Sequence, residues 1–104
     1  MSKSMLETLK ELTRKDPNNP LGRYGLANEY LKLGMYEQAI SEISAYLKLK
    51  EDEGAAYRIL GESLLKLGRK DEARDAFRRG MEVAERHGHM DMALEFEETL
   101  ESLD

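Results

Sequence analysis

The sequence contains no cysteine and no long apolar run. Without cysteine, disulfides, zinc–thiolate sites and thiol nucleophiles are excluded, so the apolar core alone must stabilise the fold. No window approaches the roughly 20 apolar residues that a membrane-spanning helix needs, and no signal-peptide core follows Met1. We therefore expect a cytoplasmic protein with no segment that enters a membrane.

An excess of basic residues is also missing. The chain has 16 Lys and Arg against 21 Asp and Glu, which gives a net charge of −5. Such a chain repels phosphate backbones and anionic lipid. We therefore expect no nucleic-acid partner and no membrane partner.

The residues that catalysis requires are missing as well. There is no phosphate-binding glycine loop, and the two histidines, His87 and His89, lie near no serine nucleophile or further metal ligands in the sequence. Two imidazoles in one turn could bind a metal, but a helix C-terminus also favours histidine. The acidic run 51–53 could bind a cation, but it is better explained as the cap of the next helix. We predict no enzyme activity, no cofactor and no metal site.

The chain does contain an internal repeat. Segment 30–40 recurs 34 residues later as 64–74, and the copies share Leu-Lys-Leu-Gly and an alanine five residues after the glycine. Apolar residues return every three to four positions before and after each glycine, which predicts two amphipathic helices per copy. Gly34 and Gly68 are expected to end the first helix of each pair in a left-handed conformation.

Small residues are placed where the two helices of each pair would meet. They are Ala27 and Ala39 in the first copy and Gly61 and Ala73 in the second, and they allow close backbone approach. This 34-residue helix-turn-helix unit resembles the tetratricopeptide repeat family over residues 20–87. The resemblance implies an all-α fold in which antiparallel helical hairpins stack as a short solenoid of about six helices.

Two positions depart from the pattern of that family. Arg23 stands where the family often has Trp, and Tyr46 stands where it prefers a small residue. Glutamates also replace the frequent proline at the repeat ends, at positions 51 and 85. These departures weaken the match to the consensus and leave the expected fold unchanged.

We expect one domain over residues 1–104. It would contain repeat one at 20–53 and repeat two at 54–87, flanked by capping helices at 5–15 and 90–103, because isolated hairpins cannot bury their apolar faces.

The first capping helix should start with a capping box. Ser4 and Glu7 have the required spacing, and Met5, Leu9 and Leu12 share one apolar face.

The last capping helix should follow Gly88, which is expected to end a long helix that begins near Lys70. Its apolar stripe is displaced by two residues from the 34-residue register, so we expect a lengthened connection at 86–89. The stripe consists of Ala93, Phe96, Leu100 and Leu103.

The resemblance implies that the first helices of the hairpins line a concave face that binds a peptide or protein segment, as in an adaptor or scaffold. Tyr24 and Arg58 are the expected anchors, since aromatic and Arg side chains dominate interface hot spots. Alternatively, Tyr24 and Arg58 are ordinary surface, and Leu31 and Leu65 only pack against neighbouring helices. The nominated residues are Tyr24, Asn28, Leu31, Lys32, Arg58, Glu62, Leu65 and Lys66, together with Leu21, Ala55 and Ile59.

The identity of the partner is less constrained. Some family members clamp a C-terminal carboxylate, but only Asn28 matches that set, so recognition of such a tail is not predicted. Lys32, Arg58 and Lys66 nonetheless favour a partner that carries carboxylates.

The main alternative function is self-association into a homo-oligomer through an apolar last helix. The side chains that suggest it are Met90, Met92, Leu94 and Phe96. An RNA-binding helical repeat or an enzyme are the remaining alternatives.

Overall fold

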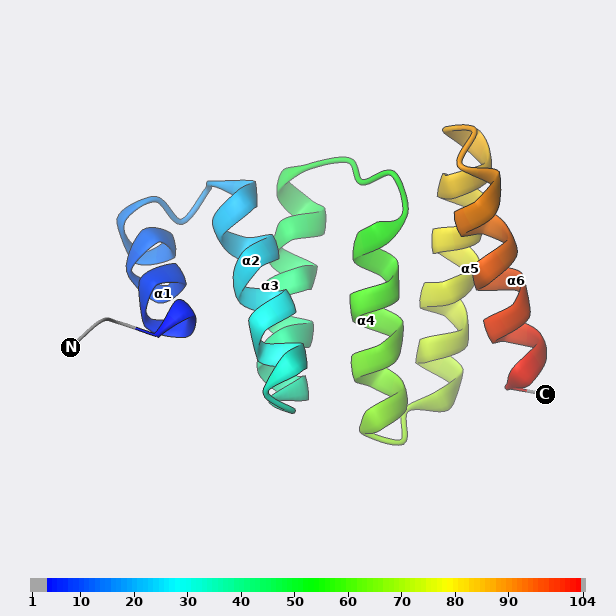
Figure 1. Cartoon of the computed structure of the whole chain (residues 1–104), viewed down its shortest axis with the longest axis horizontal. Helices are drawn as coiled ribbons and strands as arrows, with labels where there is room; N and C mark the ends of the chain where they lie inside the picture. The colour runs from blue at the N-terminus through cyan, green and yellow to red at the C-terminus, as the bar shows by residue number, and fades with distance from the viewer. Residues whose placement is uncertain (1–3, 104) are drawn as a thin grey trace.

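The computed structural model describes residues 4–103, which form six α-helices and no strand. The helices stand side by side in a row, each antiparallel to the next (Figure 1). The expected all-α stack of antiparallel helical hairpins is confirmed. The helices are α1 (Met5–Lys15), α2 (Pro20–Lys32), α3 (Tyr36–Leu49), α4 (Ala55–Lys66), α5 (Lys70–Arg86) and α6 (Met90–Ser102).

Glycine ends the first helix of each hairpin, as expected. Gly34 and Gly68 have φ angles of 76° and 78°, a left-handed region that side chains disfavour. After the first of these turns, the amide of Met35 donates a hydrogen bond of 2.8 Å to the carbonyl of Tyr30. Gly88 ends α5 in the same way, with φ of 75°. These turns reverse the chain within three residues.

The small residues allow the close helix packing that the sequence predicted. Ala39 and Ala73 are completely buried. The ring of Phe77 lies so close to the backbone of Gly61 that a Cβ atom there would overlap it. A side chain at Gly61 would therefore force α4 and α5 apart.

Helix α1 turns a different face inward from the one expected. Leu6 and Leu9 pack against the core and Thr13 is buried, whereas Met5 and Leu12 are 60% and 54% exposed. The prediction that Met5 and Leu12 share the buried face with Leu9 is wrong. Helix α1 makes its principal contacts with α2 alone, so only the stripe that faces α2 is covered.

The expected lengthening of the connection before α6 is also wrong. Three residues, 87–89, join α5 to α6, as many as in the turns 33–35 and 67–69. Instead α5 has 17 residues where α3 has 14, which is nearly one extra turn. An added helical turn satisfies its own backbone hydrogen bonds, which an added loop does not. The apolar stripe of α6 still packs on the core.

None of the described helices is both long and apolar enough to cross a bilayer.

Candidate functional site

The first helices of the hairpins share one side of the molecule. In Figure 1, α2, α4 and α6 lie toward the viewer, and α3 and α5 lie behind them. We call the side formed by α2, α4 and α6 the front face. It contains α2 and α4, the first helices of the two repeats, which the family resemblance implied as the binding side.

A cleft opens on the front face between α4 and α6. The contact between α4 and α6 is far less extensive than the contact that each makes with α5, so the space between them is open above α5. We call this hollow the α4–α6 cleft. It is lined by Ala55, Arg58, Glu62, Leu65, Phe77, Met92, Glu95, Phe96 and Thr99.

The α4–α6 cleft has an apolar floor and polar walls. Phe77 and Phe96 are nearly completely buried, with ring centroids 6.1 Å apart. The side chains of Arg58, Glu62 and Glu95 are exposed, and within residues 4–103 no ion pair or hydrogen bond engages them. An apolar hollow flanked by unengaged charges is suited to holding a side chain of another molecule.

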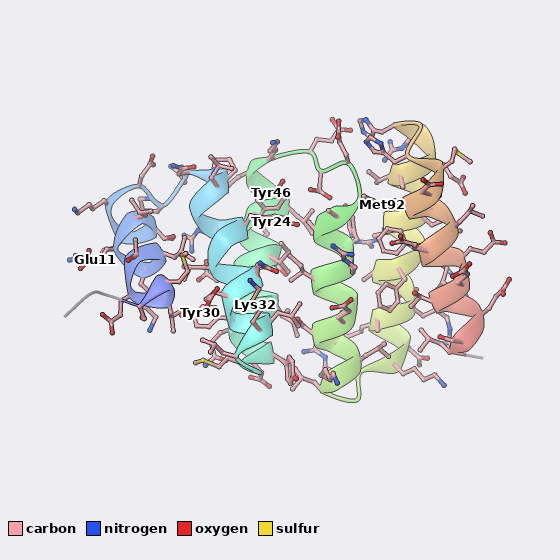
Figure 2. All side chains as sticks on the ribbon, viewed as in Figure 1. Glu11, Tyr24, Tyr30, Lys32, Tyr46 and Met92 are labelled. Carbon is pink, nitrogen blue, oxygen red and sulfur yellow. The ribbon has the colours of Figure 1, made fainter. Side chains whose placement is uncertain are left out.

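A second hollow continues from the first toward the α5–α6 turn. We call it the upper cleft. Ala55, Met92 and Glu95 line both hollows, so the two form one continuous trough. Figure 2 shows Tyr24 and Tyr46 close together in the upper part of the view, with Met92 on the other side of α4 from them. The other residues that line the upper cleft are Leu21, Lys50, Glu51, Asp52, Glu53, His87, Gly88, His89, Met90 and Asp91.

Asp52 anchors the wall of the upper cleft. Its Oδ2 atom accepts hydrogen bonds from the amides of Gly54 and Ala56 at 2.7 and 2.9 Å, which caps α4. Its Oδ1 atom accepts a bond of 3.0 Å from the Tyr46 hydroxyl. The prediction that the acidic run caps the next helix is confirmed for Asp52.

Burial and the carboxylate shift the acidity of both tyrosines. Burial raises the pKa of Tyr46 to about 12, and the hydrogen bond to Asp52 and its negative charge add to the effect. The pKa of Tyr24 is also raised, by burial first and by the charge of Asp52 second, while the positive charge of Arg58 opposes the shift. The two rings meet edge to face, 5.1 Å apart.

Comparison with known proteins places the chain in a family. A family model described as tetratricopeptide repeat matches residues 24–81. The chain belongs to the tetratricopeptide repeat family. Tetratricopeptide repeats generally mediate protein–protein interaction and are generally non-enzymatic scaffolds.

Similar proteins come from bacteria, a fungus and mammals. A TPR repeat-containing protein of Pseudomonas aeruginosa is 29% identical over 100 residues, which cover 96% of this chain and 95% of that protein. Small glutamine-rich tetratricopeptide repeat-containing protein 2 of Mycosarcoma maydis is 30% identical over 75% of this chain. Human DnaJ homolog subfamily C member 3 is 36% identical over 62% of it. The matches span only 22% and 13% of these two longer relatives.

Solved structures share the fold. A Bordetella parapertussis protein determined in solution superposes with a TM-score of 0.85, covering 98% of this chain and 89% of that one at 24% identity. The crystal structure of MamA gives a TM-score of 0.70, covering 95% of this chain and 66% of that one at 25% identity. These likenesses establish the tetratricopeptide architecture.

The repeat residues nominated from the sequence are only partly brought together. Arg58, Glu62 and Leu65 line the α4–α6 cleft, and Tyr24 lines the upper cleft. Ile59 is 3% exposed and belongs to the core, so its placement on the binding face is wrong. Arg58, Glu62 and Leu65 are spaced by four and three positions along α4, so they lie on one face of that helix.

Of the other nominated residues, Leu21 lines the upper cleft and Ala55 lines both hollows, whereas the remaining four lie outside both linings. Leu31 is half-buried and packs against two core clusters, and Asn28 is half-buried on α2. Lys32 and Lys66 are exposed at the last turns of α2 and α4. Their role in binding stays a prediction.

Sequence reasoning missed the wall that α6 contributes to the cleft. Met92, Glu95, Phe96 and Thr99 line it. These residues recur at helical spacing on α6, which takes the place of the first helix of a third hairpin in the tetratricopeptide stack. That spacing is the signal that could have identified them. Met92, Phe96 and Thr99 also lie 34 residues after Arg58, Glu62 and Leu65, so the repeat period itself relates them to the cleft residues of α4.

The two histidines lie opposite Glu53. His89 Nε2 is 3.1 Å from Oε2 of Glu53, His87 Nδ1 is 3.8 Å from its Oε1, and the imidazole rings stack 6.3 Å apart. Among residues 4–103, no group of three or more His, Asp or Glu side chains is arranged to hold a metal ion. This cluster links the α3–α4 and α5–α6 connections at the mouth of the upper cleft.

Proposed function

We propose that the front face binds a peptide or protein segment, and that the chain acts as an adaptor or scaffold without enzymatic activity. The α4–α6 cleft carries this proposal. Its buried aromatic floor and its exposed, unengaged charges are the features of a site that combines apolar contact with polar selection.

Arg58 and Leu65 are the proposed central contacts. Arg58 is exposed on the cleft wall and makes no ion pair within the described residues, so its five donors are free for a partner. Leu65, about two turns further along the same helix, supplies half-buried apolar surface. Tyr24, Asn28, Leu31, Lys32, Glu62 and Lys66 complete the proposed contact surface.

Affinity capture from native lysate tests the proposal. The wild type is compared with Arg58→Glu and with Arg78→Glu, a matched control that makes the same charge change on α5, outside both cleft linings. Retained proteins are identified by mass spectrometry and titrated in purified form. A protein whose affinity differs between wild type and Arg58→Glu, weaker or stronger, but is the same for wild type and Arg78→Glu supports the proposal. A protein that binds all three equally contradicts it, provided that circular dichroism shows each variant folded.

A second candidate function is self-association through the outer face of α6. Met90 and Leu94 are 57% and 53% exposed there, which favours it, whereas Phe96 is buried and Met92 packs against the core. Helix α6 also contains one Asp, four Glu and no basic residue, so two such helices repel each other. Self-association predicts a molar mass that rises with protein concentration and that Leu94→Glu returns to the monomer value. A constant monomer mass contradicts it.

A further inference from the structure

We infer that the segment held in the α4–α6 cleft presents a large apolar side chain next to Lys or Arg. This inference rests on the proposed function of the front face and specifies the chemistry of the partner. Three observations support it: the apolar floor, the carboxylates on both walls, and the charge of the continuous trough.

The floor selects an apolar side chain. Leu65 from α4 and Met92 from α6 are half-buried, and the rings of Phe77 and Phe96 lie beneath them. A polar side chain placed here would lose its water and gain little in return, because Leu65, Phe77 and Phe96 offer no hydrogen bond and the sulfur of Met92 is only a weak acceptor. A leucine, methionine or phenylalanine side chain gains contact area instead.

The walls select a positive charge beside that side chain. Glu62 on α4 and Glu95 on α6 flank the floor from opposite sides, and both carboxylates are exposed. Arg58 is the single cation in this lining, and Lys32 and Lys66 lie outside it. The cleft therefore favours a basic segment, in contrast to the acidic one that the sequence suggested.

The α4–α6 cleft and the upper cleft together also carry a negative net charge. Their cations are Lys50 and Arg58. The carboxylates of the two hollows are Glu51, Asp52, Glu53, Glu62, Asp91 and Glu95, so the combined lining carries a net charge of −4 with neutral histidine. The whole chain carries −5. A hollow lined mostly by one sign of charge concentrates the field and steers the opposite charge toward it.

Three short synthetic peptides test the inference with the full-length protein. The first has Leu at helical spacing and Lys elsewhere, the second replaces every Lys by Glu, and the third replaces every Leu by Ser. Fluorescence anisotropy measures the Kd of each. We expect the Leu–Lys peptide to bind at least about tenfold more tightly than either of the others, a difference of about 1.4 kcal/mol.

A matched pair of charge reversals locates the binding. Glu62→Lys/Glu95→Lys changes the cleft walls, and Glu82→Lys/Glu98→Lys makes the same change in net charge at exposed positions outside both linings. We expect the first pair to weaken binding of the Leu–Lys peptide about tenfold and the second to change it less than about threefold. Equal weakening by both pairs would show non-specific attraction and overturn the inference.

The outcomes separate this inference from the proposed function. If the Leu–Glu peptide binds best and Arg58→Glu abolishes its binding, the front face binds segments but the basic partner is wrong. If no peptide binds, or if all three bind equally, the inference is overturned, and the proposed function is still decided by the capture experiment. Tight binding of the Ser–Lys peptide would overturn the apolar anchor.

Discussion

The hydroxyl of Tyr46 donates a hydrogen bond of 3.0 Å to Oδ1 of Asp52 and so ties the end of α3 to the start of α4. Both residues are nearly completely buried. The other oxygen of the carboxylate caps α4 through two backbone amides. One side chain of the connection 50–54 therefore holds together two helices from successive repeats.

Removal of this hydroxyl should weaken the junction between the repeats. In Tyr46→Phe the buried carboxylate of Asp52 loses a donor, and we expect the free energy of unfolding to fall by about 1–2 kcal/mol. Urea denaturation followed by circular dichroism measures it. Tyr57→Phe is the control, because no hydrogen bond to the Tyr57 hydroxyl is found within residues 4–103. Equal losses in the two variants would contradict the assigned role.

The same pair predicts a loss of stability at high pH. The folded pKa of Tyr46 is about 12, above its ordinary value of 10.0, so the fold favours the neutral phenol. The contribution of neutral Tyr46 to the free energy of unfolding is complete below the pKa that Tyr46 has in the unfolded chain. It is lost as pH rises through the pKa that Tyr46 has in the folded protein. Between about pH 10 and 12, wild type should lose more stability than Tyr46→Phe. Tyr24, whose pKa is also raised, is present in both proteins. If the free energy of unfolding falls equally with pH in wild type and Tyr46→Phe, the raised pKa of Tyr46 is ruled out.

Substitution of Gly61 should be costly even though alanine is the better helix former. A Cβ atom at this position would overlap the ring of Phe77, so Gly61→Ala should destabilise by about 1–3 kcal/mol through overpacking. Thermal or urea denaturation measures the change. The double variant Gly61→Ala/Phe77→Leu should lose less than the sum of the single losses, because the shorter side chain makes room. If the double variant loses as much stability as the two single variants together, Gly61 and Phe77 are not the residues in close contact.

The ion pair between Arg23 and Glu42 should contribute measurably to stability. Its atoms are 2.8 Å apart, both side chains are less than a quarter exposed, and the Arg23 Nε also donates to the Pro17 carbonyl at 3.1 Å. A double-mutant cycle with Arg23→Met and Glu42→Gln should give a coupling energy of about 0.5–1.5 kcal/mol. The exposed pair Arg78 and Asp75, at 3.7 Å, is the control and should give less. A coupling near zero for both pairs would refute the prediction.

Local features of the fold were predictable because they depend on near neighbours in the chain. The left-handed turns at Gly34 and Gly68 follow from the conformational freedom of glycine. The hydroxyl of Ser4 accepts a hydrogen bond of 3.1 Å from the amide of Glu7, as the capping spacing indicated. The helical period and the 34-residue repeat then define the hairpins.

Features that depend on distant segments were not predictable in the same way. Which face of α1 is buried depends on the position of α2, and Met5 and Leu12 remain exposed because no helix formed by residues 4–103 covers the other side. The salt bridge of Arg23, which replaces the frequent tryptophan, required a partner 19 residues away on another helix.

The sequence by itself determined the all-α repeat, the ends of most helices and the family, because periodicity, capping and turn residues act over a few positions. Only the tertiary structure decided which nominated residues share a hollow. Arg58 and Glu62 of α4 and Glu95 and Thr99 of α6 line the same cleft. That juxtaposition depends on how helices far apart in the chain pack around Phe77 and Phe96, and no short-range pattern encodes it.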